Sequence, residues 1–365
     1  MKIPYVNFSE QNKLVKSALM ESVSRVIDSG HYILGPEVLS FENEFSQYTN
    51  SKFAIGVGNG TDALILALRA LEIGPGDEVI TVSHSFVATV SAISLIGAKP
   101  VLIDVGRDFN LDPEKIERAI NKKTKAILPV HLTGRPAQMD KIMSVAKKHG
   151  IFVIEDCAQA ISTKFQGKHV GTFGDFGTFS LHPLKNLHAF GDGGIILTQR
   201  PELNEKLKLL RNIGLRQRDN CILWAGNSRL DEIQAAMLKI NLAHLDTWTN
   251  ERRKIAHNFN NELSSLVEVP VENNNEFHTY QTYVIMSERR DELFKFLVSH
   301  GVDAKIHYPK AIHQQDVCQE LHYQDSDLPT TSEIVSKIIS LPCYPGLSLE
   351  EQKYIVQTIK RFYET

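Results

Sequence analysis

Short runs of aliphatic and β-branched residues alternate with amphipathic stretches over the first two thirds of the chain. Five of these runs predict strands, at residues 53–57, 78–82, 100–103, 126–130 and 151–154. The stretches between them carry apolar residues at helical spacing. Strands and helices that alternate in this way predict an α/β fold, in which helices cover both faces of a mostly parallel sheet.

Turn and cap residues bound the predicted helices. Thr61 is predicted to cap the helix DALILALRALEI, and the turn GPGD at residues 74–77 separates that helix from the next strand. Gly150 closes the helix before the strand at 151–154. The sequence therefore predicts where elements begin and end as well as their type.

The pattern changes after Leu245. A long helical stretch containing NERRKIAHNFNNEL leads there into a sparser mix of strands and helices that ends near Phe362. We predict a large domain at residues 1–245 and a small C-terminal α/β domain at residues 246–365. The length of 365 residues agrees with two domains, or with one large domain and an appendage, since domains commonly hold about 150 residues.

Composition and charge narrow the class of protein. Hydrophobic residues make up 42% of the chain and charged residues 23%, as in ordinary globular enzymes. The 40 Lys and Arg against 43 Asp and Glu give a net charge of −3, which supplies no electrostatic attraction for DNA or RNA. No segment reaches the ~18 uninterrupted apolar residues of a membrane helix, so we expect a cytoplasmic protein without a membrane partner.

The cysteines and histidines show no metal-binding pattern. The four cysteines lie too far apart in the sequence for a CxxC pair: Cys157, Cys221, Cys318 and Cys343. This spacing favours a reduced cytosolic compartment. The 14 histidines show no ligand spacing, and the motifs HExxH, GxSxG and GxxxxGK[ST] are absent. We therefore expect no metal site, no serine-hydrolase elbow and no P-loop.

A glycine-rich turn lies between the first predicted strand and its helix. The hexapeptide GVGNGT at residues 56–61 resembles a dinucleotide-binding fingerprint, but Thr61 stands where that motif has Gly or Ala. This departure counts against a nucleotide-sugar oxidoreductase. Because the N–H groups and positive dipole end of a helix attract anions, Gly60, Thr61 and Asp62 are predicted to bind a phosphate. A helix cap without a ligand is the alternative.

Two carboxylates, Glu155 and Asp156, follow the apolar strand at 151–154. Ligands of open parallel sheets bind at the carboxyl ends of the strands. A carboxylate there pairs with a cationic ring nitrogen, and Asp156 is predicted to do so for a protonated pyridine. Gln159, three residues further on, is predicted to reach a neighbouring polar group. A capping or surface carboxylate is the alternative for Asp156.

A lysine follows the next apolar strand, in the segment DFGTFSLHPLKNLHAFGDGG at residues 175–194. Most single lysines are solvated surface residues. Lys185, however, lies 29 residues after Asp156, in a segment whose glycines let the backbone approach a ligand. A lysine that loses part of its hydration there has a lowered pKa and forms a Schiff base with an aldehyde.

Six segments, taken in order, resemble the DegT/DnrJ/EryC1/StrS family of sugar aminotransferases. They are GNGTDALILALRAL, GPGDEVI, IEDCAQA, FGDFGTFSLHPLKNLHAFGDGG, NSRLDEIQAA and KIHYP, and the resemblance covers about residues 32–313. It implies a pyridoxal-phosphate enzyme of fold type I, as in aspartate aminotransferase, and a homodimer whose active sites take residues from both subunits. The family's dehydratase branch has His in place of the lysine, whereas Lys185 is present here.

The resemblance also implies roles for individual residues. Lys185 would be the Schiff-base lysine and move protons, Asp156 would pair with the pyridine nitrogen, and Gln159 would lie beside the ring hydroxyl. Phe86 would stack on the ring, with a core aromatic as the alternative. The phosphate would be bound by four residues: Thr61, Asp62, Ser180 and, from the other subunit, Asn227. A helix N-cap is the alternative for the last of these.

The reaction that the resemblance implies uses L-glutamate as amino donor and a nucleotide-linked keto sugar as acceptor. SLHPLKNL, NIGLRQRD and the ending GDGG are similar to the branch that aminates C3 of a dTDP-linked 3-keto-6-deoxyhexose. The product would be an amino sugar for a surface polysaccharide such as an O-antigen or S-layer glycan. A C4 aminotransferase on a UDP- or GDP-linked 4-keto sugar and a non-catalytic regulatory homologue are the alternatives.

Candidate contacts to the sugar come from the lysine loop, the NSRLDE motif and the KIHYP region. Six residues belong to this set: His182, His188, Arg229, His307, Tyr308 and His313. Alternatively, the first two histidines only fill space, and the arginine pairs with Asp231 or Glu232.

Overall fold

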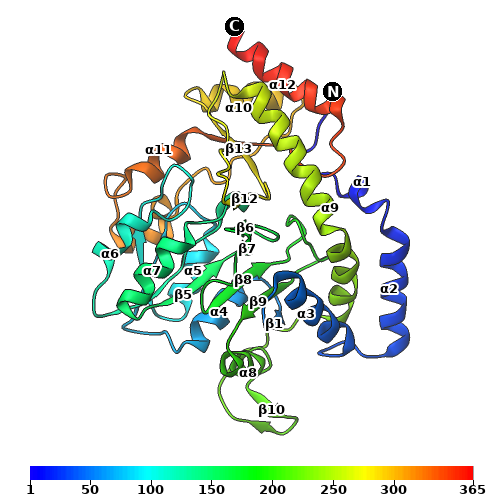
Figure 1. Cartoon of the computed structure of the whole chain (residues 1–365), viewed down its shortest axis with the longest axis vertical. Coiled ribbons are helices and arrows are strands. Elements are labelled where there is room, and N and C mark those ends of the chain that lie inside the picture. Colours follow the sequence, from blue (N-terminus) through cyan, green and yellow to red (C-terminus); the bar gives the residue numbers. More distant parts are fainter. Residues whose placement is uncertain (365) are drawn as a thin grey trace.

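A seven-stranded sheet forms the centre of the larger part of the molecule in the computed structural model, which describes residues 1–364 (Figure 1). In order across the sheet, the strands are β1 (Phe53–Val57), β9 (Gly194–Thr198), β8 (Phe176–Ser180), β5 (Phe152–Asp156), β4 (Thr124–Ile127), β2 (Glu78–Val82) and β3 (Lys99–Ile103). The pairs from β8 to β3 are parallel, whereas β9 runs antiparallel to both of its neighbours. The predicted α/β fold with a mostly parallel sheet is confirmed.

Two predicted strand ends differ from the structure for backbone reasons. β4 ends at Ile127, three residues before the predicted end, because Pro129 has no N–H to continue the ladder. β5 continues to Asp156 instead of ending at Ile154, and the N–H of Asp156 donates to the Pro129 carbonyl at 2.9 Å. Both carboxylates of the Glu155-Asp156 pair are therefore fixed within the sheet.

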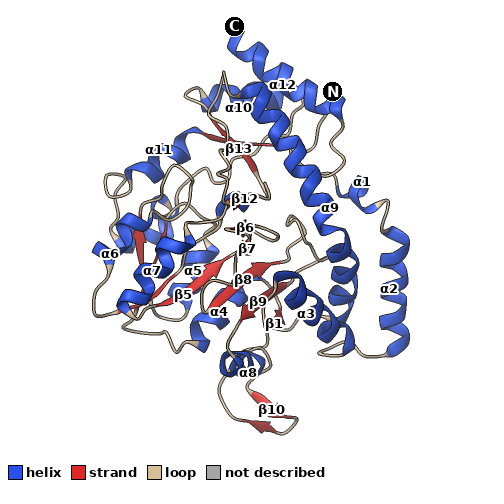
Figure 2. Cartoon of the chain, viewed as in Figure 1, coloured by secondary structure: helices blue, strands red, loops and turns tan. Residues whose placement is uncertain are grey.

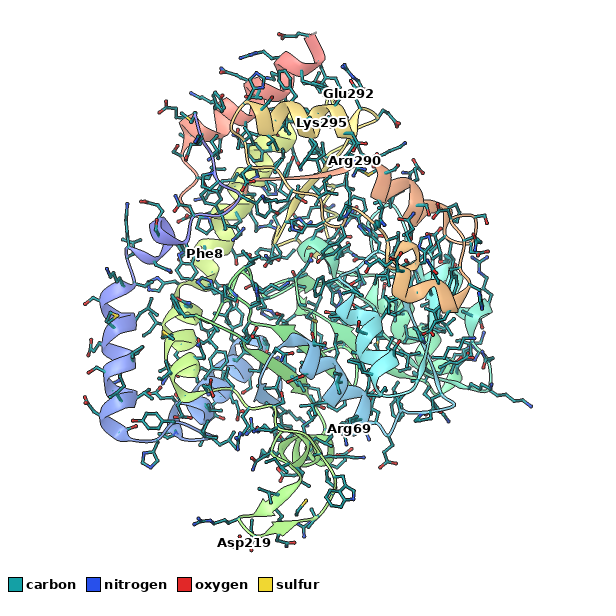
Figure 3. All side chains as sticks on the ribbon, turned by 180° about the vertical axis from the view of Figure 1, so that it is seen from behind. Phe8, Arg69, Asp219, Arg290, Glu292 and Lys295 are labelled. Atoms are coloured by element: carbon teal, nitrogen blue, oxygen red, sulfur yellow. The ribbon has the colours of Figure 1, made fainter. Side chains whose placement is uncertain are left out.

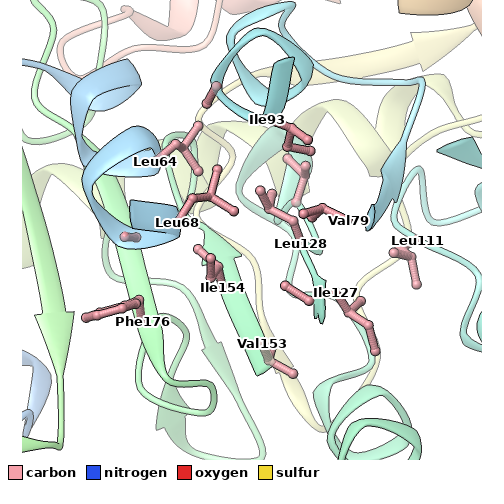
Figure 4. Close-up of a cluster of buried hydrophobic side chains, with 14 of the residues drawn as sticks. Leu64, Leu68, Val79, Ile93, Leu111, Ile127, Leu128, Val153, Ile154 and Phe176 are labelled. Carbon is pink, nitrogen blue, oxygen red and sulfur yellow. The ribbon is translucent and has the colours of Figure 1, made fainter. Parts of the chain in front are cut away.

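Helices cover both faces of the sheet (Figure 2). Neighbouring residues of a strand point to opposite faces, and β9 shows this division. Ile196 packs in one core with α4 (Gly60–Ala70) and α5 (Ala88–Leu95), as Figure 4 shows for Leu64 and Leu68 of α4. Ile195 and Leu197 pack in another core with α3 (Pro36–Thr49) and α9 (Glu232–Leu263).

A separate core lies in the C-terminal part of the chain, around the antiparallel pair β13 (Tyr283–Met286) and β14 (Ile338–Leu341). Ile3 joins this core and pairs with Val302, so the N-terminus packs with the C-terminal part. The predicted boundary at Leu245 falls inside α9, which is one continuous helix. The two parts are thus connected by a helix that contributes to both cores.

The remaining elements complete the layers and the edges of the molecule. The helices are α1 (Phe8–Asn12), α2 (Lys16–Ser29), α6 (Ile116–Ala119), α7 (Met139–His149), α8 (Pro201–Leu210), α10 (Arg290–Ser299), α11 (Pro329–Lys337) and α12 (Leu349–Glu364), with short 3-10 turns at Pro113–Lys115, Leu132–Gly134, Ile312–Gln314 and Asp316–Leu321. The short strands are β6 (Lys164–Phe165), β7 (Lys168–His169), β10 (Leu215–Gln217), β11 (Asn220–Cys221) and β12 (Glu276–Phe277). Within residues 1–364, no helix is both long enough and apolar enough to cross a membrane.

Candidate active site

The carboxyl ends of five strands meet at one edge of the sheet and border a cavity of about 710 Å³. Because β9 runs against both β8 and β1, β1 ends at the same edge as β2, β4, β5 and β8. The segments that follow these strands line the cavity, together with residues of the C-terminal part. The predicted site residues in this lining are Gly60, Thr61, Asp62, Phe86, Asp156, Gln159, Ser180, His182, Lys185, His307 and Tyr308.

The first turn of α4 forms one side of the cavity. This helix begins at Gly60 and is capped by Asn59, whose side-chain oxygen accepts the N–H of Asp62 at 2.8 Å. The predicted cap at Thr61 is therefore wrong by two residues, because the chain is already helical at Gly60 and a cap residue has non-helical backbone. The N–H groups of Gly60 and Thr61 instead belong to the first turn, where they have no partner within the helix.

Ser180, the last residue of β8, lies directly against Gly60. A Cβ atom added to Gly60 would lie 2.6 Å from the Ser180 Cβ, so only glycine fits there. The free N–H groups of the helix turn, with the hydroxyls of Thr61 and Ser180, suit a phosphate. Asp62 lines the same place, but its N–H is used by the cap and its carboxylate accepts the Ser228 hydroxyl at 2.6 Å.

Asp156 is a buried carboxylate that lines the cavity with 4% of its surface exposed. Its Oδ2 accepts the Thr89 hydroxyl at 2.8 Å, and its Oδ1 accepts the Ala158 N–H at 3.1 Å. Burial raises the pKa of Asp156, while these two hydrogen bonds and the nearby Lys185 act in the opposite direction. A carboxylate in this position favours a cationic partner, as a protonated ring nitrogen would be.

Glu155 points to the other face of the sheet and takes no part in the cavity. Its Oε1 accepts the backbone N–H groups of Phe173 and Gly174. Its Oε2 accepts the N–H of Gly171 and lies 3.1 Å from the His131 Nε2. These side chains and Cys157 come close enough to hold a metal ion. Because the described partners already occupy both carboxylate oxygens, we assign Glu155 a structural role.

Lys185 lies in the loop that follows β8 and is partly covered. Its backbone N–H donates to the His182 carbonyl at 2.9 Å, which fixes the turn that carries it. Burial lowers the pKa of Lys185 to about 8, although Asp156 raises it. More of this amine is therefore neutral at physiological pH than in an ordinary lysine, as a nucleophile for an aldehyde requires.

Gln159 connects the sheet edge to the C-terminal part. Its side-chain oxygen accepts the Thr133 N–H at 2.7 Å, and its amide donates to the Tyr308 hydroxyl at 3.0 Å. The Tyr308 ring lies 5.8 Å from the ring of Phe86, centre to centre. Phe86 is 55% exposed, so it is not a core aromatic and offers a face to a ligand.

Two of the predicted histidines line the cavity, and they differ in exposure and in hydrogen bonding. His182 is exposed, and its ring nitrogen accepts the Leu184 N–H at 3.2 Å. The Nδ1 of His307 lies 2.9 Å from the Ser340 hydroxyl. Because burial lowers the pKa of His307 to about 4, this ring is neutral at pH 7.

The other two predicted histidines lie away from the cavity lining. His188 is 2% exposed and packs between the rings of Phe8 and Trp248, beside α9 (Figure 3 labels Phe8). This position matches the space-filling alternative. His313 is also buried, and its Nδ1 lies 2.7 Å from the Ser83 hydroxyl. Both rings are held by packing or by protein partners, which leaves neither at the surface that a sugar would contact.

Two predicted residues of the NSRLDE motif also lie outside the cavity of their own chain. Arg229 donates to the Asn212 side chain at 3.1 Å and pairs with neither Asp231 nor Glu232. Asn227 is exposed and does not cap α9, whose N-cap is Asp231. The predicted contact between Asn227 and the cofactor therefore requires a second subunit.

Thr89, Ser228 and Arg252 are among the residues of the site that went unpredicted. Thr89 and Ser228 donate hydrogen bonds to the predicted carboxylates Asp156 and Asp62. Ser228 lies next to Asn227, so the NSRLDE motif could have revealed it. Arg252 lines the cavity from α9, but a single arginine within a helical pattern gives no local signal of its position.

Comparison with known proteins decides the family. The DegT/DnrJ/EryC1/StrS aminotransferase family matches residues 14–360. The chain belongs to this family. The predicted resemblance to this family is confirmed, and the protein is a sugar aminotransferase.

Three relatives illustrate how the members of this aminotransferase family are named. The chain is 42% identical to the "Pleiotropic regulatory protein" of Geobacillus stearothermophilus, over 100% of this chain and 99% of that protein. It is 40% identical to the dTDP-3-amino-3,6-dideoxy-alpha-D-galactopyranose transaminase of Aneurinibacillus thermoaerophilus, over 99% of both chains. It is 39% identical to the UDP-N-acetyl-3-dehydro-alpha-D-glucosamine 3-aminotransferase of Acidithiobacillus ferrooxidans, over 98% of this chain and 97% of that one.

Solved structures of the aminotransferase family share the fold over the whole chain. DesV of S. venezuelae, solved in complex with a ketimine intermediate, superposes with a TM-score of 0.97 at 38% identity and covers 100% of this chain and 99% of its own. The NtdA protein of Bacillus subtilis, with bound cofactor PMP, superposes with a TM-score of 0.94 at 29% identity and covers 100% and 86%. The predicted fold type of pyridoxal-phosphate-dependent transferases is thereby confirmed.

Proposed function

We propose that this aminotransferase acts in the cytoplasm and moves the amino group of L-glutamate to C3 of a dTDP-linked 3-keto-6-deoxyhexose. The observation that best supports transamination is that Lys185 and Asp156 line the same cavity. The pKa of the Lys185 amine is about 8, and the Asp156 carboxylate is buried. The product is an amino sugar for a surface polysaccharide or glycoconjugate, such as an O-antigen or an S-layer glycan.

Pyridoxal phosphate is the cofactor, and the cavity fits it. Gly60, Thr61 and Ser180 would hold the phosphate, at the place where a Cβ on Gly60 has no room. Asp156 would pair with the ring nitrogen, and Phe86 offers its exposed ring as a stacking surface. When bound, the cofactor supplies an aldehyde that takes up an amino group and a protonated ring that withdraws electrons.

Lys185 supplies the amine that holds the cofactor and, once free, moves a proton at its Nζ. A pKa of about 8 suits both roles, because the neutral amine accepts a proton and the cation returns it near physiological pH. Asp156 provides the negative charge that keeps a ring nitrogen protonated. Thr89 fixes the Oδ2 of that carboxylate through its 2.8 Å hydrogen bond.

The position of amination and the carrier nucleotide rest on relatives and on the lysine segment. The names of the relatives from A. thermoaerophilus and A. ferrooxidans both place the amino group at C3, one on a dTDP sugar and one on a UDP sugar. The ending GDGG of the lysine segment supports the same position. A C4 aminotransferase on a UDP- or GDP-linked sugar is the nearest competing function.

A regulatory role without catalysis is the second alternative function. One relative is named as a regulatory protein, which is the reason to consider it. A protein that kept the fold only for regulation would not need a covalent cofactor. This chain retains both Lys185 and Asp156, and both residues line the cavity. We therefore favour the enzyme.

We further propose that the enzyme is a homodimer with shared active sites. The hairpin β10–β11 protrudes from the body of the molecule, with Asp219 at its tip (Figure 3). Beyond it, Trp224 is 91% exposed, and the exposed Asn227 follows. A second copy that covers Trp224 would bring this segment, with Asn227, to the partner's cavity.

The test of the proposed function follows the cofactor and the product. Purified protein with pyridoxal phosphate is treated with L-glutamate and then with dTDP- and UDP-linked 3-keto and 4-keto sugars, and NMR locates the new C–N bond. We expect the absorbance of the bound cofactor to change with glutamate and to return only with a dTDP-linked 3-keto sugar. Return with a 4-keto sugar would replace the acceptor, and no absorbance change after adding pyridoxal phosphate would refute the enzyme.

A further inference from the structure

The loop that carries Lys185 is held by a side chain from the C-terminal part of the chain. Gln281 lies two residues before β13 and lines the cavity. Its Oε1 accepts the backbone N–H of Asn186 at 2.9 Å, and its Nε2 donates to the backbone carbonyl of Leu184 at 2.7 Å. One side-chain amide therefore binds the backbone on both sides of Lys185.

These two hydrogen bonds restrain the backbone of Lys185 itself. The Leu184 carbonyl belongs to the peptide plane before the Lys185 Cα, and the Asn186 N–H belongs to the plane after it. Because peptide groups are planar, the φ and ψ angles of Lys185 set how the two planes lie relative to each other. An amide that is bonded to both planes restrains both angles, and with them the direction in which the lysine side chain leaves the loop.

The glutamine is suited to this task by its chemistry and by its surroundings. Its side chain holds an acceptor and a donor in one plane. The segment that carries it is packed against the sheet side, where the N–H of Thr279 donates to the Gly134 carbonyl at 3.0 Å. Tyr280 and Tyr283, on either side of Gln281, are fully buried. The amide is thus attached to a fixed segment of the backbone.

We propose that Gln281 is a positioning residue, which directs the amine of Lys185 to the point in the cavity where it bonds to the cofactor and moves protons. Loops hold functional groups less precisely than strands do, unless neighbouring hydrogen bonds support them. Lys185 lies in a loop, whereas Asp156 is the last residue of a strand. A displacement of about 1 Å can lower a rate by about 10²-fold, so the lysine needs this support.

This inference rests on the proposed function, since it concerns the lysine of that same site. It also gives the C-terminal part a role in the chemistry. Gln281 precedes β13, which belongs to the separate core of that part. A shift of this core relative to the sheet is therefore passed to the backbone of Lys185.

The test compares wild type with three variants of the full chain. Gln281→Met removes both hydrogen bonds and keeps a side chain of similar length. Gln281→Glu keeps the acceptor for the Asn186 N–H and removes the donor. The control is Gln319→Met, which changes an exposed glutamine outside the cavity lining.

The first measurement is hydrogen exchange, resolved to single amides, on protein without cofactor. We expect the Asn186 amide to exchange about 3- to 10-fold faster in Gln281→Met, because it loses its acceptor. It should exchange at the wild-type rate in Gln281→Glu and in Gln319→Met. The Asp156 amide, which donates to the Pro129 carbonyl, should stay unchanged in every variant and shows that the sheet is intact.

The second measurement is the rate at which Lys185 reacts with pyridoxal phosphate between about pH 7 and 9.5. The amine and the aldehyde form a C=N bond with loss of water, borohydride reduces this bond, and mass spectrometry quantifies the product. The rate should reach a plateau at high pH, where the amine is neutral. We expect that plateau to be about tenfold lower in Gln281→Met, intermediate in Gln281→Glu and unchanged in Gln319→Met. In turnover, kcat should fall by a similar factor, while KM changes less than about twofold.

The outcomes separate this inference from the proposed function. Faster exchange at Asn186 together with a lower plateau supports the inference, even in a protein that aminates no sugar, which would overturn only the function. A wild-type plateau in Gln281→Met, or a change confined to KM, would overturn the inference and leave an active enzyme as proposed. A profile that only moves along the pH axis would also overturn it, because Gln281 would then alter the charge of Lys185 and not its position. If the Asp156 amide loses protection in Gln281→Met, the plateau of Gln281→Glu decides: a lower value supports the inference, and the wild-type value overturns it.

Discussion

The two sides of the cavity are built in different ways. On the side of the sheet, each group either ends a strand, as Asp156 and Ser180 do, or follows the end of a strand by only a few residues, as Gly60, Phe86 and Lys185 do. On the side of the C-terminal part, the groups come from the N-terminal segment, the middle of α9 and two separate loops: Tyr5, Arg252, His307 and Cys343. The sheet side is defined by local sequence, whereas the other side exists only after distant segments have packed.

We infer from this difference that the two sides of the cavity have different roles, one in holding the cofactor and one in binding the substrate. Groups at the ends of hydrogen-bonded strands are held rigidly, as a covalent cofactor requires. Groups on helices and loops around a second core can be exchanged without disturbing the sheet. We therefore expect substitutions on the sheet side to abolish the chemistry, and substitutions on the other side to change which substrate binds.

The largest effect is expected for Lys185→Ala. The variant lacks both the amine that holds the cofactor and the group that moves the proton. The rate should therefore fall by at least about 10³-fold, since general acid–base catalysis alone contributes ~10²–10⁴-fold. The absorbance of the cofactor joined to the lysine should also be missing before glutamate is added. Lys208→Ala, which removes an exposed lysine of α8, is the control and should keep full activity. Glutamate-dependent turnover by Lys185→Ala would refute the assignment.

A smaller loss is expected for Gly60→Ala. The added Cβ would meet the Ser180 Cβ at 2.6 Å, so the first turn of α4 must move away from β8. Crowding of this kind typically costs about 1–3 kcal/mol, and the loss should appear as weaker binding of pyridoxal phosphate in an equilibrium titration. Gly76→Ala tests strain without crowding, because no atom lies near its Cβ position. Unchanged cofactor affinity in Gly60→Ala would show that the phosphate binds elsewhere.

The sequence predicted the sheet side well because its signals are local. An apolar strand followed by carboxylates placed Asp156, and a strand followed by glycines placed Lys185. The cap at Thr61 was wrong because helix caps depend on the backbone of one residue, which a pattern does not resolve. The position of His188 beside Trp248 depends on contacts between α9 and the lysine loop, and no pattern in either segment encodes it.

A further test of the sheet side is Thr89→Val. This change removes the 2.8 Å hydrogen bond to Asp156 and leaves a side chain of similar shape. We expect the rate to fall by about tenfold, since a hydrogen bond to a charged group contributes about 1.5–3 kcal/mol. Because this bond opposes the raised pKa of Asp156, its loss should also shift the acidic limb of the pH–rate profile upward.

Thr89→Ser is the matched control, since it keeps the hydroxyl that donates to Asp156 and lies 2.7 Å from Ser85. It should restore most of the rate and the original pH profile. A pH profile that is the same in Thr89→Val and wild type would mean that Thr89 only fills space. A fall in both variants would point to packing rather than to the hydrogen bond.

The smallest expected effect is on the stability of the cofactor-free protein. Burial lowers the pKa of Lys185 from 10.5 to about 8 in the folded chain. Between these two pKa values the unfolded chain binds more protons at Lys185 than the folded chain does, so the stability of the folded protein rises with pH there. Below pH 8, the contribution of Lys185 to stability is at its lowest. Lys185→Met removes the penalty, and its unfolding temperature should exceed that of wild type at pH 7 by a few degrees, since 1 kcal/mol corresponds to about 2–4 °C in large domains. Thermal unfolding between pH 7 and 11 measures this difference, which should disappear above about pH 10.5. A difference in unfolding temperature that stays constant over the whole pH range would show that the methionine acts through packing. Burial of the charged Lys185 amine would then not destabilise the folded protein.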